Sequence, residues 1–152
     1  QAYNLAILPA ISKPLHYTIS YDITCVDRET GEEYQMAETN KDYVLFAICN
    51  ASYYGGGYCP APNSLLDDGL LDFALVDGLS LSQVLPLIPK YSAGNANEET
   101  SNGLVHTGLI KSGRIWTEDG SMLLGNCDGE NFDYSVVDFK VEEKALKLCV
   151  IK

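Results

Sequence analysis

A mainly β fold, built as a β-sandwich with one packed helix, is the architecture that this sequence predicts. Short segments in which apolar and polar residues alternate recur along the chain, as expected for half-buried strands. A single segment combines helical spacing with signals for a helix start and a helix end. The 152 residues contain no internal repeat, and their number is ordinary for one domain.

The predicted strands follow one another along the whole chain. Alternation is clearest near the C-terminus, where Val137, Phe139 and Val141 are separated by charged residues. The run 43–49 is apolar throughout, which predicts a central strand covered on both faces. The predicted strands are 16–25, 34–38, 43–49, 71–76, 104–109, 114–117, 122–124, 134–141 and 145–151.

The helix is predicted over 80–94. Ser80 and Gln83 have the spacing of a capping box, and Gly94 is placed to end the helix. Two prolines inside the segment are expected to kink or shorten it. Its apolar face would consist of Leu81, Val84, Leu85 and Ile88.

Three other segments do not read as regular strands. Residues 1–11 carry leucine and isoleucine at helical spacing, with Pro9 as an internal breaker. The stretch 50–69 is a long irregular connection, and loops of this length are either functional or disordered. The stretch 95–103 is polar, and we expect it to be mobile.

Composition excludes several classes of function. The formal net charge is −11, with 10 basic against 21 acidic residues and no basic cluster, which argues against nucleic acid or an anionic lipid surface as the direct partner. An acidic domain that handles phosphate needs a metal, or cations from another domain. No apolar run approaches the ~20 residues of a membrane span. Because the chain begins at Gln1 rather than Met, we expect a fragment or a processed product.

The five cysteines are scattered, without a C-x-x-C pair, so zinc and redox motifs are absent from the sequence. Most of them lie inside or beside apolar runs, where cysteine acts as a small core residue. We therefore expect a reducing, cytoplasmic environment.

Two loop motifs could bind ligands. Gly55, Gly56 and Gly57 are consecutive, which predicts positive φ angles or the close approach of a ligand, although a bulge or loop corner explains them equally well. Asp67 and Asp68 precede a glycine and could hold a hard cation together with nearby carbonyls. The competing interpretation of this second motif is a simple turn, because Asp-Gly favours turn geometry.

A third motif, Asp128-Gly129-Glu130, could carry acid–base chemistry. If the segment is extended, the two carboxylates lie two residues apart and point to the same face. Such a pair could accept a proton from a hydroxyl nucleophile or ligate a metal. By itself, the motif is better explained by another hairpin turn, given Gly125 and Gly129.

The order of these motifs resembles the C-terminal half of the diacylglycerol kinase-like soluble lipid kinases, which include bacterial diacylglycerol kinases and sphingosine and ceramide kinases. The pattern runs from Asn50 and the three glycines through Ala61-Pro62 and D-G-L-L-D to the capped helix and D-G-E. It covers essentially the whole chain from the first strand. The chain departs from the family pattern after the helix, where Gly94 is followed by Asn95 rather than by histidine.

The resemblance implies a fold and a reaction. This chain would be the second domain of a two-domain fold like that of NAD kinases and diacylglycerol kinases. The intact enzyme would transfer the γ-phosphoryl group of ATP to a lipid hydroxyl. Asp128 maps onto the general base, and Glu130 maps onto its partner carboxylate near the catalytic Mg²⁺. Asp68 maps onto a second, structural Mg²⁺ site together with the backbone carbonyls of Leu65 and Leu70.

The resemblance also implies what lies outside this chain. Members of the family carry an N-terminal domain with a G-G-D-G-T loop that receives ATP, and this sequence has no G-G-D-G-T. The expected partners are that domain and a lipid alcohol, with Gly55, Gly56 and Gly57 near the cofactor. We expect this chain to be inactive alone. Peripheral membrane contact and a homodimer stay open.

A different class of function also accounts for the loops. A non-catalytic β-sandwich module that binds carbohydrate or a cation would explain the glycines, the tyrosines and the Asp-Gly turns without ATP. Calcium or sugar dependence of thermal stability is expected for such a module and not for the kinase domain.

Overall fold

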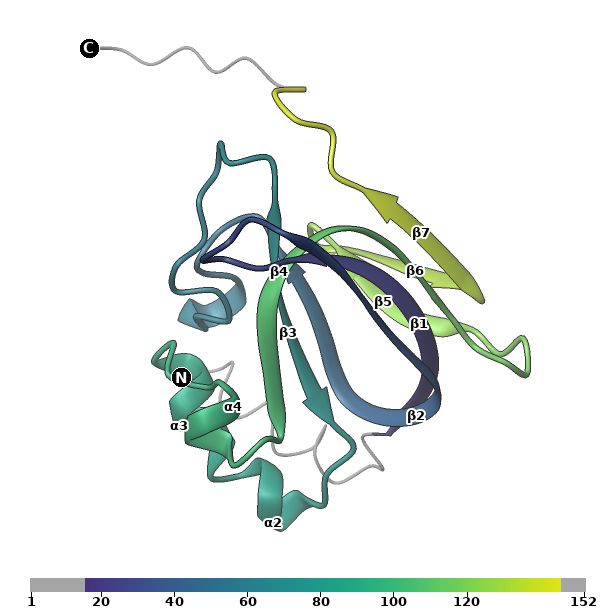
Figure 1. The fold of residues 1–152 in the computed structure, drawn as a ribbon. Coiled ribbons are helices and arrows are strands. Elements are labelled where there is room, and N and C mark those ends of the chain that lie inside the picture. The colour runs from purple at the N-terminus through teal and green to yellow at the C-terminus, as the bar shows by residue number, and fades with distance from the viewer. Residues whose placement is uncertain (1–15, 146–152) are drawn as a thin grey trace.

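The computed structural model describes residues 16–145 and confirms the mainly β, antiparallel fold (Figure 1). The strands are β1 (Tyr17–Val26), β2 (Glu33–Cys49), β3 (Leu71–Asp77), β4 (Val105–Trp116), β5 (Leu123–Cys127), β6 (Glu130–Tyr134) and β7 (Val136–Lys140). The helical segments are the 3₁₀ turn η1 (Gly55–Gly57) and the short helices α2 (Leu81–Val84), α3 (Leu87–Ser92) and α4 (Glu98–Ser101).

One curled sheet forms both layers of the fold. Its strand order is β1-β2-β3-β4-β7, and β1 pairs with β4 as well as with β2. The first part of β2 pairs with β1 and its last part with β3, while β4 pairs first with β3 and then with β1. The two layers therefore share their long strands. Strands β5 and β6 form a separate hairpin, away from the helices (Figure 1).

The strands predicted at 34–38 and 43–49 are one continuous strand, β2, so the prediction of two strands is wrong. The pairing of β1 with β2 shifts between Ile19 and Tyr21, opposite a bulge at Asn40, whose φ is 55°. The Ser20 hydroxyl accepts a hydrogen bond from the Asn40 backbone N–H at 2.9 Å. A bulge bends a strand without ending it, which lets β2 pass from one layer to the other.

The strands predicted at 104–109 and 114–117 are likewise one strand, β4. Gly113 lies inside it and does not interrupt the pairing with β1. A Cβ atom at Gly113 would lie 2.6 Å from Ile23 Cγ2 and 2.9 Å from the Asp22 carbonyl oxygen. Glycine is therefore required for close packing of β1 against β4 at this position.

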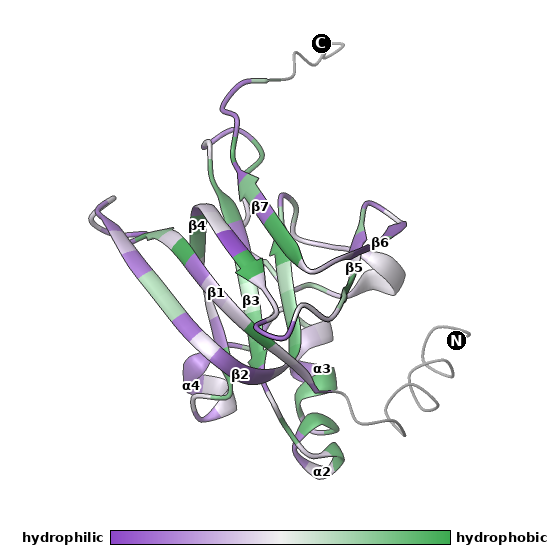
Figure 2. Cartoon of the chain, turned by 90° about the vertical axis from the view of Figure 1, so that its right-hand side faces the viewer, coloured by the Kyte–Doolittle hydropathy of each residue, from purple (hydrophilic) through white to green (hydrophobic). Residues whose placement is uncertain are grey.

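The main hydrophobic core lies between the two layers. In β3, Phe73 and Leu75 face this core, while Val76 packs in a second cluster with Leu79, Leu87 and Val105. Figure 2 shows β3 largely in hydrophobic colours. The strand buried on both faces is therefore β3, whereas in the predicted strand 43–49 most residues are half-buried. The main core consists of Ile19, Tyr21, Ile23, Cys25, Tyr43, Phe73, Leu75 and Ile110.

The predicted helix 80–94 is two short helices, α2 and α3, so the expected effect of the prolines is confirmed. Gln83 accepts a hydrogen bond from the Ser80 backbone N–H at 3.1 Å, as the capping box predicts. Gly94 has a φ of 72° and ends α3. Its N–H donates to the Tyr91 carbonyl at 3.3 Å, and the next N–H donates to the Lys90 carbonyl at 2.8 Å, which is a Schellman motif.

Other elements differ from their predicted bounds. The segment 95–103 contains α4, which begins at a cap in which Asn97 Oδ1 accepts from the Thr100 N–H at 2.9 Å. Strand β6 was not predicted, and β5 extends beyond the predicted strand 122–124. The segment 1–11, with its helical spacing, and nearly all of the predicted strand 145–151 lie outside the described residues. None of the helices in 16–145 has the length and apolar character to cross a membrane.

The cysteines partly follow their expected role as core residues. Cys25, Cys49 and Cys59 are buried, as predicted. Cys127 is exposed, because it lies in the hairpin formed by β5 and β6 rather than in the curled sheet. Cys149 lies outside the described residues.

Arg28 ties the β1–β2 turn to β3 by an ion pair and to the long loop 50–70 by a hydrogen bond. Arg28 Nη2 lies 2.6 Å from Asp72 Oδ1, and Arg28 Nη1 donates to the Asn63 carbonyl at 3.4 Å. Asp72 is 7% exposed, and burial raises the pKa of its carboxyl group while the Arg28 charge acts in the opposite direction. The pair lines a pocket of about 330 Å³ between this turn, the loop and the segment after α3.

Arg28→Met is expected to lower the free energy of unfolding by about 1–3 kcal/mol at pH 7, because it leaves a buried carboxylate unpaired. Without Arg28, the pKa of folded Asp72 rises further above its unfolded value. Protonated Asp72 then favours the folded state, and that contribution is lost as the pH rises through the folded pKa. The deficit should therefore shrink from pH 7 towards pH 4 in urea unfolding measurements.

The matched control adds Asp72→Asn to Arg28→Met, which removes the titrating group. The pH dependence of the deficit should disappear in this double variant. If Arg28→Met lowers the free energy of unfolding equally at pH 4 and pH 7, the charge of Arg28 does not stabilise Asp72, and Arg28 contributes only through packing.

Candidate functional site

The motif Asp128-Gly129-Glu130 forms the tip of the β5–β6 hairpin. Asp128 and Gly129 have φ angles of 50° and 94°, and Cys127 pairs directly with Glu130. Two consecutive residues with positive φ are the signature of a type I′ turn. The hairpin-turn interpretation of this motif is therefore confirmed, and the alternative of an extended segment with both carboxylates on one face does not apply. Asp128 lies in the turn, and Glu130 begins β6.

Asparagine side chains hold this turn in place. Asn126 Oδ1 accepts a hydrogen bond from the Gly129 N–H at 3.1 Å, and its Nδ2 donates to Asn131 Oδ1 at 3.0 Å. Asp128 and Glu130 are exposed, and within residues 16–145 neither carboxylate has a hydrogen-bond or ion-pair partner. Two adjacent negative charges thus stand on a fixed turn, open to a proton donor or a cation.

The glycine triplet forms the turn η1. Gly56 and Gly57 have φ angles of 75° and 89°, which confirms the predicted need for positive φ. Tyr54 and Tyr58 pair across the turn, with a 3.0 Å hydrogen bond from the Tyr54 N–H to the Tyr58 carbonyl. A Cβ atom at Gly57 would meet no described atom within 4 Å, so the space beside it is open.

Tyr91 of α3 contacts the two tyrosines that flank this turn. Its hydroxyl lies 2.9 Å from the Tyr54 hydroxyl, and its ring centroid is 6.3 Å from that of Tyr58. Burial raises the pKa of both Tyr54 and Tyr91, so both hydroxyls stay protonated at neutral pH. The helix thereby fixes the position of the glycine turn.

The segment Leu65–Leu70 approaches the end of the described chain. Asp68 Oδ1 accepts a hydrogen bond from the Leu70 N–H at 3.0 Å, which closes an Asx turn and supports the turn interpretation of this motif. A Cβ atom at Gly69 would lie 2.6 Å from Glu143 Cγ. Gly69, with a φ of 76°, is thus required both for the turn and for this close contact.

The Asx turn is compatible with a cation at Asp68. A carboxylate has two oxygens, and the N–H of Leu70 uses one of them. Within 16–145, no loop hydrogen bond ends on the carbonyl oxygen of Leu65 or Leu70. No group of three His, Cys, Asp or Glu side chains with metal-binding geometry occurs in the same range, so a cation here would depend on carbonyls and water.

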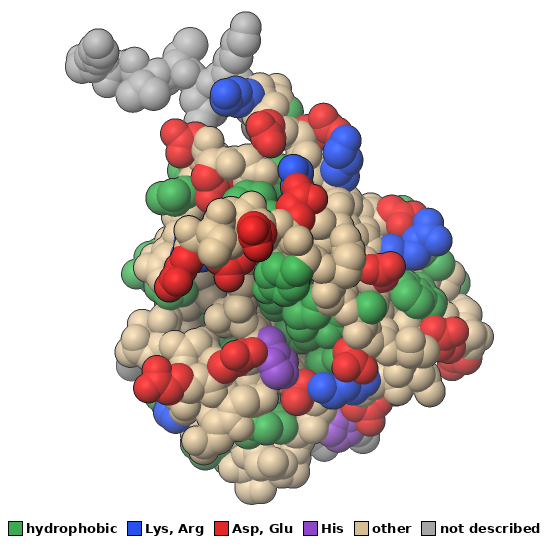
Figure 3. All heavy atoms as spheres, viewed as in Figure 1, with side chains coloured by type: hydrophobic (Ala, Val, Ile, Leu, Met, Phe, Trp, Pro, Cys, Tyr) green, Lys and Arg blue, Asp and Glu red, His purple; other side chains and the backbone are tan. Residues whose placement is uncertain are grey.

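The three motifs occupy separate loops. Among residues 16–145, no hydrogen bond or ion pair joins the hairpin tip, the glycine turn and the Asp68 turn to one another. The chain has a formal net charge of −11, and Figure 3 shows acidic side chains spread over the visible face. If the three loops belong to one active centre, a ligand or a further part of the protein must connect them.

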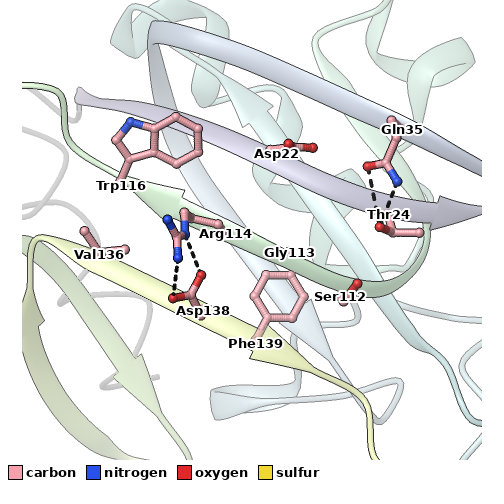
Figure 4. A pocket seen from close by; sticks show the side chains of 10 residues that line it. All are labelled: Asp22, Thr24, Gln35, Ser112, Gly113, Arg114, Trp116, Val136, Asp138 and Phe139. Carbon is pink, nitrogen blue, oxygen red and sulfur yellow. Dashed lines mark hydrogen bonds and ion pairs between the residues drawn. The ribbon is translucent and has the colours of Figure 1, made fainter.

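A pocket on the outer face of β1, β4 and β7 lies away from these motifs (Figure 4). It has a volume of about 840 Å³. Arg114 donates two hydrogen bonds to Asp138, at 2.6 and 3.0 Å, and Trp116 Nε1 donates to Glu118 at 2.8 Å. These charges satisfy one another on an exposed surface, which makes this pocket a weaker candidate than the hairpin tip.

Sequence reasoning missed several residues that shape these loops. Asp72 was recognised as part of a motif, and an aspartate inside a buried strand signals a partner. Nothing in the sequence identifies Arg28 as that partner, since it lies 44 residues away. Tyr91 is one of 10 tyrosines and carries no local signal.

Comparison with known proteins places the chain in a family. Residues 2–150 match the model of the YegS C-terminal NAD kinase β-sandwich-like domain. A 54-residue segment is 41% identical to a protein of Shewanella frigidimarina (strain NCIMB 400) named "Probable lipid kinase YegS-like". That match covers 36% of this chain and 18% of the relative.

Solved structures share the fold. Two structures from Bacillus anthracis str. Sterne, both named as a "putative diacylglycerol kinase", superpose with TM-scores of 0.57 and 0.55 at 20% and 22% identity. They cover 91% and 90% of this chain but only 43% and 41% of their own chains. The chain thus spans less than half the length of these structures. It belongs to the family of YegS C-terminal NAD kinase β-sandwich-like domains.

Proposed function

We propose that this chain supplies the acceptor side of an ATP-dependent lipid kinase that phosphorylates a lipid hydroxyl such as that of diacylglycerol. One observation carries the proposal: a type I′ turn holds Asp128 and Glu130 as two exposed carboxylates without partners among residues 16–145. The name of the relative, "Probable lipid kinase YegS-like", supports the reaction class.

In the proposed reaction, the lipid hydroxyl oxygen forms a bond to the γ-phosphorus of ATP. The bond between that phosphorus and the β,γ-bridging oxygen breaks, and ADP leaves. Asp128 accepts the proton of the hydroxyl, so the products are a phosphorylated lipid and ADP. Phosphoryl transfer depends mainly on positioning and charge stabilisation, and a carboxylate on a rigid turn is suited to that task.

Glu130 and Asp68 are proposed as metal-linked residues. Bound Mg²⁺ neutralises the charge that develops on the phosphates. Glu130 would hold such an ion at the hairpin, and Asp68 would hold a second ion with the carbonyls of Leu65 and Leu70. The one-sided hydrogen bonding of the Asp68 carboxylate leaves an oxygen available for this role.

ATP itself would be bound mainly by another domain of the parent chain. This chain contains no G-G-D-G-T segment. Its matches cover only 43% and 41% of the two solved structures, which are therefore much longer than this chain. We propose that the glycine turn η1 and its tyrosine anchors border the nucleotide. Because the acceptor is a lipid, the enzyme would work at a membrane surface and take ATP from the cytoplasm.

The decisive experiment is a phosphorylation screen of the full-length protein against a panel of lipid alcohols. The expected result is transfer of ³²P from ATP to at least one lipid hydroxyl. If no lipid is labelled and calcium or a sugar instead raises the melting temperature, the domain is a binding module.

The 152-residue chain alone is expected to transfer no phosphate to any lipid, because it lacks the G-G-D-G-T loop. Thermal melting should show that it still folds cooperatively. Lipid-dependent ATP turnover by the purified chain, free of contaminating kinase, would contradict the proposed division of roles.

Asp128→Asn in the full-length protein is expected to lower kcat by roughly 10²–10⁴-fold, as for the loss of a positioned base. Asparagine tolerates positive φ, and Asn-Gly favours the same turn, so the melting temperature should change little. Glu130→Gln should also lose activity, with part of it restored at higher Mg²⁺. The readouts are steady-state kinetics and thermal melting.

Asp133→Asn is the matched control, since Asp133 is an exposed carboxylate on the other face of the same hairpin. It should keep nearly the wild-type rate. If Asp128→Asn retains more than about a tenth of that rate, Asp128 is a turn residue and not the base.

Wild-type domain is expected to melt several degrees higher in millimolar Mg²⁺ than in a chelator. A site of moderate affinity adds about 1–3 kcal/mol to the folded state. Asp68→Asn should erase most of this difference, while its amide oxygen can still accept from the Leu70 N–H. Asp67→Asn is the control and should keep the difference. An equal Mg²⁺ response in wild type and Asp68→Asn would remove the metal assignment.

A further inference from the structure

The β5–β6 hairpin has two chemically different faces. The cross-strand pairs Leu123–Tyr134, Gly125–Phe132 and Cys127–Glu130 alternate with Leu124–Asp133 and Asn126–Asn131. Since paired residues in antiparallel strands point to the same side, the first three pairs share one face. This face, which we call the aromatic face, carries Phe132 and Tyr134 in one row with Glu130.

Packing fixes the aromatic row. A Cβ atom at Gly125 would overlap the ring of Phe132, so glycine makes room for the ring to lie across β5. The rings of Phe132 and Tyr134 are stacked, with centroids 5.8 Å apart and planes 21° apart. The first ring is therefore held on both sides, which gives the row a defined surface.

The two rings are not part of the core. Leu123, on the same face, packs against the main core, whereas Phe132 is half-buried and Tyr134 is 62% exposed, and neither ring belongs to the residues packed against that core. A two-stranded hairpin gains little from an exposed aromatic ring, and exposed apolar surface of this kind often marks a binding site. The position of the row beside Glu130 indicates what would bind.

The rings of Phe132 and Tyr134 follow Glu130 along the same strand, close to the proposed site of phosphoryl transfer. Residues two apart on a strand are separated by about 7 Å, so Phe132 lies about 7 Å and Tyr134 about 13 Å along the strand from Glu130. In an in-line transfer, the base and the acceptor lie on the opposite side of the γ-phosphorus from the leaving ADP. The groups nearest to this hairpin would therefore belong to the acceptor.

The negative charge of the hairpin also favours the acceptor over the nucleotide as the bound group. The hairpin, from Leu123 to Tyr134, contains Asp128, Glu130 and Asp133 and no lysine or arginine. Such a surface repels the phosphates of a nucleotide but not a neutral chain. An apolar row beside unpaired carboxylates thus fits an uncharged lipid alcohol, with its hydroxyl at the carboxylates and its chain along the rings.

We propose that Phe132 and Tyr134 hold the apolar part of the lipid acceptor beside Glu130 and thereby determine acceptor specificity. The inference rests on the proposed kinase function and names which residues of this chain contact the lipid. Gly125 would be a positioning residue, because it allows the ring of Phe132 to lie across β5.

The test uses the full-length enzyme and dioctanoylglycerol in mixed micelles. Phe132→Ala and Tyr134→Ala should each raise KM for the lipid by about tenfold, as expected for loss of a buried ring contact, with KM for ATP unchanged within about twofold. Gly125→Ala should reproduce the effect of Phe132→Ala by displacing the ring. Thermal melting verifies that each variant folds, and exposed Tyr134 is the safest site if the other two destabilise the hairpin.

Leu124→Ala is the matched control, since Leu124 is 72% exposed on the opposite face of the same hairpin. It should leave both KM values unchanged. A rise in KM for ATP alone would assign the row to the nucleotide, and unchanged constants or an equal loss in Leu124→Ala would reduce it to a structural feature. Each of these results overturns the inference while kinase activity persists. A wild-type enzyme that labels no lipid overturns the proposed function and this inference with it.

Discussion

The double pairing of β1 is the constraint on which the rest of the structure depends. Because β1 pairs with both β2 and β4, a single sheet curls into two layers and encloses the main core. Two local features permit this pairing: the bulge at Asn40, held by Ser20, and the absence of a side chain at Gly113. The strands bend at these points, and this fixes the positions at which the loops following β2 and β4 begin.

Because the ends of β2 and β3 are fixed by the sheet, the irregular segment 50–70 between them can hold its motifs in defined positions. The loop between β2 and β3 is anchored at Tyr54 by the hydroxyl of Tyr91 from α3, and at Asn63, whose carbonyl accepts from Arg28 of the β1–β2 turn. Each anchor joins residues far apart in sequence, so ordering one segment helps to order the other. The glycine turn and the Asp68 turn are thereby positioned by the core fold rather than by their own sequences.

Alternation in the sequence located most strands because it reflects burial on one face, and Ser80, Gln83 and Gly94 located the helical segment because caps are local signals. Continuity could not be predicted. Asn40 and Gly113 look like strand breakers, and their role depends on partners in β1 that no local pattern identifies. The Asp128 motif was ambiguous for the same reason, since the register of β5 with β6 decides between an extended segment and a turn.

The hairpin that carries this motif forms a sheet of its own, and no residue of β5 or β6 is buried. For the proposed role this placement is suitable, because a base must reach a bound hydroxyl and must also be held in position. The I′ turn and the Asn126 hydrogen bonds fix the carboxylates without burying them. The hairpin supplies acceptors of protons and cations but no positive charge. In the proposed kinase, stabilisation of the triphosphate would therefore come from outside this hairpin, and a separate nucleotide-binding domain is the arrangement that the lack of positive charge favours.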